Sequence, residues 1–209
     1  MKSGYLLFYR ILCGKGGIFM SAKENGSDNK NLKLFGTVEE LVICALFVAM
    51  SIVLGKFLSI KIGDNFRISF ENLSLIMAGM LFGPIIGMAT AVVSDVVGCI
   101  LYGYSINPVI TIGAGLIGLF AGVVSALVFK RKMLPNIIAS VFTSHIVGSM
   151  IVKSIGLRIW YGTSIKLLLL RVPIYIVTGI CEILIIYALF RSKAFRVHFD
   201  RIRNKYDQI

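Results

Sequence analysis

The chain has 209 residues, of which 57% are hydrophobic and only 15% are charged, and its mean hydropathy is +0.86. This composition excludes an ordinary soluble domain and indicates an integral membrane protein. The net charge of +12 does not point to nucleic acid, because the basic residues lie in tails and short loops that flank apolar runs.

The N-terminal residues 1–36 are expected to be a tail outside the fold. The stretch KGGIFM at residues 15–20 back-translates to a purine-rich ribosome-binding site followed by a start codon. One hypothesis is therefore that Met20 is the true start and that residues 1–19 are a translated leader. The alternative is a basic, aromatic segment at the membrane interface. Residues 20–31 are polar and rich in Gly, Ser and Asn, which predicts disorder.

Six apolar runs follow, and a helix needs about 20 apolar residues to span a membrane. The runs predict transmembrane helices at residues 38–58, 69–82, 84–102, 108–129, 134–155 and 165–190, the last beginning at either 165 or 172. The second run is short, so it is tilted, extended by the residues before it, or partly lining a cavity. The fold class is all-α, with six transmembrane helices in a domain at residues 37–192 and a basic cytoplasmic tail at 193–209.

The connection between the first two predicted helices, KIGDNFRISFEN at residues 61–72, alternates around residues 67–70 as a strand does. It is therefore predicted to be a strand-like outer loop. Fifteen of the 22 Lys and Arg residues lie in residues 1–36, the 130–132 loop and the C-terminal residues 191–209, all on one side of a six-helix bundle. The positive-inside rule makes that side cytoplasmic and puts both termini there.

Seven basic residues remain near the outer ends of the predicted helices: Lys56, Lys61, Arg67, Lys153, Arg158, Lys166 and Arg171. Lys56 and Lys166 fit anchors that reach the lipid interface. Arg67, Arg158 and Arg171 suggest instead an outward-facing pocket for an anion. Trp160, the single tryptophan, is either an interfacial belt residue or, in a loop above the cavity, a stacking surface for a flat ligand.

Polar residues inside membrane helices cost free energy, so each marks a candidate site. Three sets recur at helical spacing: Ala91, Asp95, Gly98 and Tyr102; His145, Ser149 and Lys153; and Arg171, Tyr175, Thr178 and Glu182. Asp95 and Glu182 could merely pair with a buried partner such as His145 or Lys153. The alignment of three stripes favours a shared polar cavity open to the outside. Two other helices carry small residues at four-residue spacing, which allows close helix packing. The fourth predicted helix has Ala114, Gly118, Gly122 and Ala126, and the first has Ala45 and Ala49.

Catalytic signatures are missing from the sequence. It contains no GxxxxGK[ST] loop for ATP, no HExxH and no Ser/His/Asp order. The four cysteines show no CxxC spacing, and two histidines make a His-based metal centre improbable. We expect neither an enzyme nor a bound metal or cofactor.

Two stretches carry a resemblance to a known family. RISFENLSLIMAGMLFGPIIG at 67–87 and SDVVGCILYGYSINPVITIGAGLIG at 94–118, with the AxxxA of residues 45–49, resemble the substrate-binding S components of energy-coupling factor (ECF) vitamin transporters. They are most similar to the folate-specific family. The resemblance covers about residues 41–190. It implies a multi-pass protein of a prokaryotic cell membrane that captures a vitamin from outside. It also implies a transmembrane coupling protein and two cytoplasmic ATPases as partners.

The resemblance also implies which residues act. Ala45 and Ala49 match the surface that docks onto the coupling protein. Loops between helices 1 and 2, 3 and 4, and 5 and 6 would cover the pocket. The candidate ligand-binding residues are Arg67, Phe70, Glu71, Asn72, Asp95, Tyr104, Asn107, Lys153, Arg158, Trp160, Arg171 and Tyr175. Folate offers a flat pterin with N–H groups for a carboxylate and a glutamate end for Arg67, Arg158 or Lys153.

Two alternatives stay open from the sequence. The first is an S component for another vitamin or precursor; the basic outer pocket disfavours cationic thiamine but not pantothenate. The second is a membrane-embedded enzyme acting on a lipid headgroup. This alternative is weaker because the sequence shows no nucleophile–base pair and no clustered carboxylates for a metal. A solitary channel is disfavoured because the inner halves of the first and fourth helices carry no polar stripe.

Overall fold

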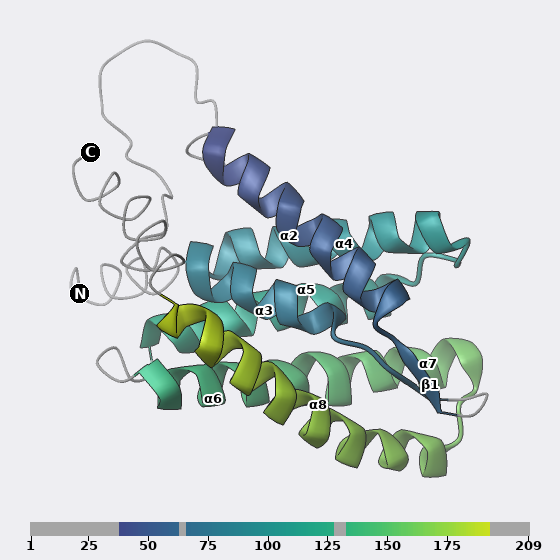
Figure 1. Ribbon diagram of the computed structural model, residues 1–209. Helices are drawn as coiled ribbons and strands as arrows, with labels where there is room; N and C mark the ends of the chain where they lie inside the picture. The colour runs from purple at the N-terminus through teal and green to yellow at the C-terminus, as the bar shows by residue number, and fades with distance from the viewer. Residues whose placement is uncertain (1–37, 63–65, 128–132, 193–209) are drawn as a thin grey trace, which may run out of the picture.

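The computed structural model describes residues 38–62, 66–127 and 133–192 (Figure 1). The predicted tails at residues 1–36 and 193–209 and the alternative start at Met20 lie outside this part of the chain. The elements are, in chain order, α2 (Val38–Phe57), β1 (Ile60–Ile62), β2 (Phe66–Ile68), α3 (Glu71–Phe82), α4 (Pro84–Tyr102), α5 (Pro108–Leu127), α6 (Met133–Ser144), the π-helix η2 (His145–Val152), α7 (Lys153–Tyr161) and α8 (Ile165–Arg191).

The described elements form a helical bundle with one small hairpin. Four helices are long and apolar enough to cross a membrane: Pro84–Tyr102, Pro108–Leu127, Met133–Tyr161 and Ile165–Arg191. The apolar helices Leu41–Phe57 and Glu71–Phe82 are shorter. Each predicted run is thus occupied by a helix, and four of them meet the length of a membrane span.

The hairpin joins α2 to α3. Its strands β1 and β2 pair antiparallel, with Lys61 opposite Arg67. β2 ends at Ile68, two residues before the predicted alternation ends, because the chain already turns into α3 there: the N–H of Leu73 donates to the carbonyl of Phe70 at 3.1 Å. The strand-like region is therefore confined to three residues on each side.

Close contact between α3, α4 and α5 depends on glycine. A Cβ at Gly118 of α5 would collide with the backbone oxygen of Gly87 of α4, and a Cβ at Gly79 of α3 would collide with that of Gly118. The turn between α3 and α4 needs glycine as well, since Gly83 has φ +90° and Pro84 begins the next helix. The small-residue seam of residues 114–126 thus packs inside the bundle.

α3 lies at the centre of the bundle, and all eight residues from Asn72 to Gly79 are buried. Its 12 residues span only about 18 Å at 1.5 Å per residue, well short of a membrane's apolar thickness of about 30 Å. Of the three explanations for its shortness, the structure supports the third, because Glu71 and Leu75 at its N-terminal end line a cavity.

The helix that starts at Met133 runs through η2 without a break to Tyr161. The predicted end of the fifth helix at residue 155 was therefore wrong, and the connection to α8 is confined to residues 162–164. Nothing in residues 156–161 forces a helix to end before Gly162, which has φ +61° and accepts the left-handed conformation that closes α7.

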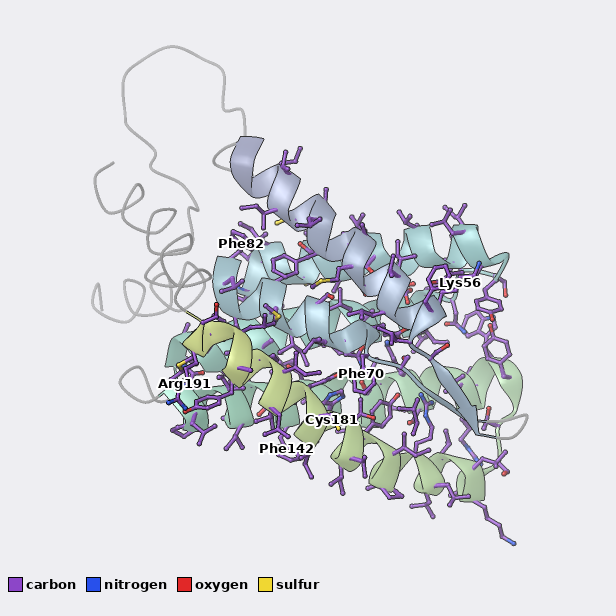
Figure 2. The ribbon with its side chains drawn as sticks, in the orientation of Figure 1. Lys56, Phe70, Phe82, Phe142, Cys181 and Arg191 are labelled. Carbon is purple, nitrogen blue, oxygen red and sulfur yellow. The ribbon has the colours of Figure 1, made fainter. Side chains whose placement is uncertain are left out.

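Three connections lie at one end of the bundle: the hairpin, the α4–α5 connection and the α7–α8 connection (Figure 1). Figure 2 shows Lys56, in the last turn of α2, near this hairpin end, and Arg191, in the last turn of α8, at the opposite end. The cavity described next lies at the hairpin end.

Candidate ligand-binding cavity

A cavity of about 470 Å³ lies among α2, α3, α4, α5, α7 and α8. This volume is within the range of about 300–1,000 Å³ that is typical of small-molecule sites. Apolar side chains such as Ile52, Leu75 and Ile174 form part of its wall. Its polar lining comprises Ser51, Ser69, Glu71, Ser94, Asp95, Tyr102, Tyr104, Ser105, Asn107, Lys153, Tyr161, Thr163, Arg171 and Tyr175.

One wall contains an ion pair between α3 and α7. Lys153 Nζ lies 3.6 Å from Glu71 Oε1. Glu71 begins α3, where a carboxylate is favoured by the positive end of the helix dipole, and its backbone oxygen accepts a hydrogen bond from Ser51 Oγ at 3.0 Å. Lys153 is buried against α5, close to Gly113. The cation of Lys153 therefore already has an anionic partner.

Another wall contains Asp95 of α4 and the start of α5. Thr111 Oγ1 donates to Asp95 Oδ2 at 2.7 Å. Asn107 precedes Pro108, the first residue of α5, and its Oδ1 accepts from the N–H of Val109 at 3.0 Å. A side-chain acceptor before a proline is a common way to begin a helix. The SINP sequence thus fixes the start of α5 and brings Thr111 to Asp95.

The third polar wall belongs to α8. An N–H of Arg171 donates to the hydroxyl of Tyr175 at 2.7 Å, and Arg171 Cζ lies 5.4 Å from the centre of the Tyr175 ring. The other terminal nitrogen of Arg171, Nη1, is buried and has no hydrogen-bond partner among residues 38–62, 66–127 and 133–192. Arg171 therefore has donor capacity left inside the cavity.

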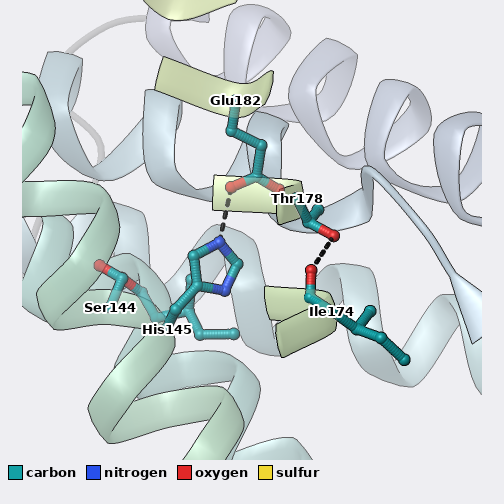
Figure 3. Close-up of polar contacts among 6 residues, drawn as sticks. Ser144, His145, Ile174, Thr178 and Glu182 are labelled. Carbon is teal, nitrogen blue, oxygen red and sulfur yellow. Dashed lines mark hydrogen bonds and ion pairs between the residues drawn. The ribbon is translucent and has the colours of Figure 1, made fainter. Parts of the chain in front are cut away.

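His145 and Glu182 form a fully buried polar pair (Figure 3). His145 Nε2 and Glu182 Oε2 are 2.7 Å apart, and at most 1% of either side chain is exposed. The His145 ring packs against the Tyr175 ring, with the two centres 5.4 Å apart. Thr178, on the same face of α8, donates to the carbonyl of Ile174 instead. Glu182 is thus paired with His145, one of the two partners suggested from the sequence, whereas Lys153, the other, is paired with Glu71.

Part of the cavity lining is aromatic. Tyr102 and Tyr104 meet edge to face with ring centres 6.0 Å apart, and Lys56 Nζ lies 5.2 Å from the Tyr102 ring centre. The Tyr102 hydroxyl donates to the carbonyl of Ile52 on α2. These contacts join α2 to the α4–α5 connection at the hairpin end.

Seven of the twelve candidate ligand residues line this cavity: Glu71, Asp95, Tyr104, Asn107, Lys153, Arg171 and Tyr175. The remaining five are not among the residues that line the cavity. Phe70 is half-buried and Asn72 is buried, both outside the lining, and Arg158 and Trp160 are exposed, with Trp160 58% exposed. Arg67 lies in β2, and its side chain is outside the described part of the chain. Ala45 and Ala49 are exposed on α2.

Sequence reasoning missed Tyr161, Thr163, Ser51 and Ser94 in the lining. Tyr161 had a signal, because Lys153, Leu157 and Tyr161 follow one another at i, i+4 and i+8 and all three line the cavity. In the part of the chain that the structure describes, no group of three His, Cys, Asp or Glu side chains is placed to hold a metal ion.

Comparisons with known proteins give one family model and two curated relatives. The family model described as "ECF-type riboflavin transporter, S component" matches residues 35–195. The folate transporter FolT of Clostridium novyi is 27% identical over 135 residues, which cover 63% of this chain and 75% of that protein. An uncharacterized protein of Mycoplasma pneumoniae is 27% identical over 138 residues, covering 64% of this chain but only 28% of the relative's length.

Two solved structures share the fold. FolT bound with folic acid has a TM-score of 0.62 and 21% identity, covering 73% of this chain and 93% of that one. The S component of a bacterial ECF transporter has a TM-score of 0.58 and 21% identity, covering 76% and 97%. Since the family model covers most of the chain, the protein belongs to the ECF-type riboflavin transporter S component family of membrane transport proteins.

Proposed function

We propose that the protein is the substrate-capture subunit of an ECF-type importer, and that it binds folate or a related pterin vitamin from outside the cell. The observation that carries this proposal is the cavity at the hairpin end, which has the volume of a small-molecule site and places carboxylates and cations on its walls. Folate matches such a lining, because it combines a flat heterocycle bearing N–H donors with two carboxylates. The similarity to a folate transporter supports the same ligand.

The proposed topology has six membrane-spanning helices, with the two shorter helices α2 and α3 completing the four long ones. Both termini are cytoplasmic and the hairpin faces outward. Fifteen of the 22 Lys and Arg residues lie in residues 1–36, the 130–132 loop and residues 191–209, which favours this orientation. The cavity then opens to the outside at the cell membrane, where a nutrient is captured.

Delivery requires partners, which we propose to be a transmembrane coupling protein and two cytoplasmic ATPases. Ala45 and Ala49 lie on the exposed side of α2, and Leu46 beside them is 67% exposed. Small residues at four-residue spacing allow another helix to approach closely. This surface of α2, Ala45 to Ala49, is the proposed docking surface.

Riboflavin is a second candidate, because the matching family model is described by that vitamin. Its flat ring would fit a cavity of this size, but riboflavin is uncharged. The free donor capacity of Arg171 in the cavity favours a ligand that carries an anionic group, because buried charged groups need charged or hydrogen-bonding partners. The charges therefore favour folate.

Binding to the purified full-length protein tests the proposal. Isothermal titration should show folate binding with a dissociation constant below about 1 μM, equivalent to about 8 kcal/mol. Riboflavin and pantothenate should bind at least about a hundredfold more weakly, since each would leave charged groups of the cavity unpaired. Tight riboflavin binding without folate binding would reject the folate assignment and support the second candidate. Mass spectrometry of the small molecule that co-purifies gives an independent answer.

A further inference from the structure

The two cations of the cavity differ in what they already bind. Lys153 Nζ lies 3.6 Å from the carboxylate of Glu71. Arg171 has no carboxylate within ion-pair distance among the described residues, and its Nη1 is buried without a partner. An unpaired guanidinium inside a membrane protein is costly unless a ligand supplies the missing anion. The free positive charge of the cavity is therefore on α8, at Arg171.

Arg171 is held in place by a chain of contacts that ends deep in the bundle. Its Nη2 donates to the Tyr175 hydroxyl at 2.7 Å, and the Tyr175 ring packs 5.4 Å from the His145 ring. His145 is fixed in turn by Glu182 at 2.7 Å. Because His145 and Glu182 are fully buried, this support cannot move without disturbing the packed core. Tyr175 is thus a positioning residue for Arg171.

The free negative charge lies on another helix. Asp95 of α4 is contacted by the hydroxyl of Thr111, and none of the ion pairs among described residues includes it. α4 and α8 lie on opposite sides of the bundle (Figure 1), and both Asp95 and Arg171 line the one cavity. Because Glu71 and Lys153 pair with each other, two groups in the cavity remain to bind the charged or polar ends of a ligand. Asp95 can accept hydrogen bonds on one side, and Arg171 can bind an anion on the other.

We infer that the ligand is a heterocycle with N–H donors joined to a carboxylate, and that it lies across the cavity with its donors on Asp95 and its carboxylate on Arg171. Tyr175, braced by the His145–Glu182 pair, orients the guanidinium so that Nη1 faces the ligand. This inference rests on the proposed function and adds to it the direction of the bound ligand. It assigns the carboxylate to Arg171 and not to Lys153 or Arg158.

The test compares two ligands on variants of the full chain: folic acid, and a pterin that lacks the aminobenzoylglutamate group. Arg171→Ala should weaken folic acid binding about 10- to 100-fold, the usual effect of losing a hydrogen bond to a charged group, and should change pterin binding by no more than about twofold. Asp95→Asn should weaken both ligands. Arg158→Ala, which changes an exposed arginine outside the cavity lining, is the matched control and should change neither.

The positioning role has its own readout. Tyr175→Phe keeps the ring on His145 but removes the hydroxyl, so it should weaken folic acid about three- to tenfold, leave the pterin unchanged and leave the melting temperature within about 2 °C of the wild type. Arg171→Lys should restore part of the folic acid affinity lost in Arg171→Ala, because it restores the charge but not the planar donor group.

Two results would overturn the inference while the proposed function stands. One is a wild-type protein that binds folic acid tightly and an Arg171→Ala variant that binds it equally well. The other is an equal loss of both ligands in Arg171→Ala, which would make the arginine structural. A wild-type protein that binds riboflavin and neither pterin compound would overturn both the proposed function and this ligand direction.

Discussion

Replacing Glu182 by leucine tests how much the buried pair contributes to stability. The change leaves His145 without its partner at a site where its ring is 1% exposed. Breaking a buried ion pair by removing one partner costs about 3–5 kcal/mol, whereas loss of a neutral hydrogen bond costs about 1 kcal/mol. For a domain of 150–250 residues, each kcal/mol lowers the melting temperature by about 2–4 °C. We therefore expect Glu182→Leu to melt about 2–20 °C below the wild type, with the larger losses corresponding to a charged pair.

The matched variants are His145→Leu and the double leucine replacement, all measured by thermal unfolding in the same detergent or lipid nanodisc. Two facing leucines leave no polar group without a partner, and such replacements are often neutral or stabilising. The double variant should therefore be more stable than Glu182→Leu alone. Glu182→Gln keeps a hydrogen-bonding side chain of nearly the same volume, so its melting temperature should fall less than that of Glu182→Leu.

The reasoning fails if the two single losses simply add in the double variant, since additivity means that the two side chains are not coupled. It also fails if Glu182→Leu melts within about 2 °C of the wild type, which corresponds to less than about 1 kcal/mol. Either result would mean that the 2.7 Å contact contributes little and that other packing holds α8 against η2.

Three further predictions concern other parts of the bundle. Gly118→Ala should lower the melting temperature by several degrees, because its methyl group collides with the backbone of Gly87, whereas Gly179→Ala, where a Cβ has ordinary contacts, should be neutral or stabilising. Ala49→Trp should leave folate affinity unchanged but abolish uptake by cells that express the whole importer; normal uptake would remove the docking assignment. Lys153→Met should lower folate affinity about tenfold in titration calorimetry, because the negative charge of Glu71 then faces an anionic ligand without the Lys153 cation beside it; unchanged affinity would contradict the electrostatic role of that pair.

Helical spacing alone predicted much of the cavity. Arg171 and Tyr175 are four residues apart, and Asp95 lies about two turns before Tyr102, so local geometry puts each set on one helix face. The partners were not predictable in the same way. Whether Lys153 meets Glu71 or Glu182 depends on how two helices are rotated about their axes, and that rotation is set by packing across the whole bundle.

The aromatic residues at the C-terminal end of α7 also show what could not be predicted from the sequence. Trp160 was predicted to be either an interfacial belt residue or a stacking surface for a flat ligand, and the structure puts its neighbour Tyr161 in the cavity lining. Consecutive residues on a helix point about 100° apart, so treating residues 156–161 as a loop removed the information that separates them. The hairpin between α2 and α3, by contrast, was visible in the alternation of a few residues, because strand periodicity is local.

The π-helix η2, His145–Val152, has a consequence for how the sequence tolerates insertion and deletion. Its wider turns accommodate residues that a regular α-helix of the same height would not, and they end where Lys153 enters the cavity wall. Deleting one residue from a regular α-helix turns everything after it by about 100°, whereas a deletion within η2 is largely absorbed when a π turn returns to an α turn, so that Lys153, Leu157 and Tyr161 stay close to their direction relative to His145. The π geometry of this short segment therefore sets the rotational register between the core of the protein and the ligand-facing side of α7.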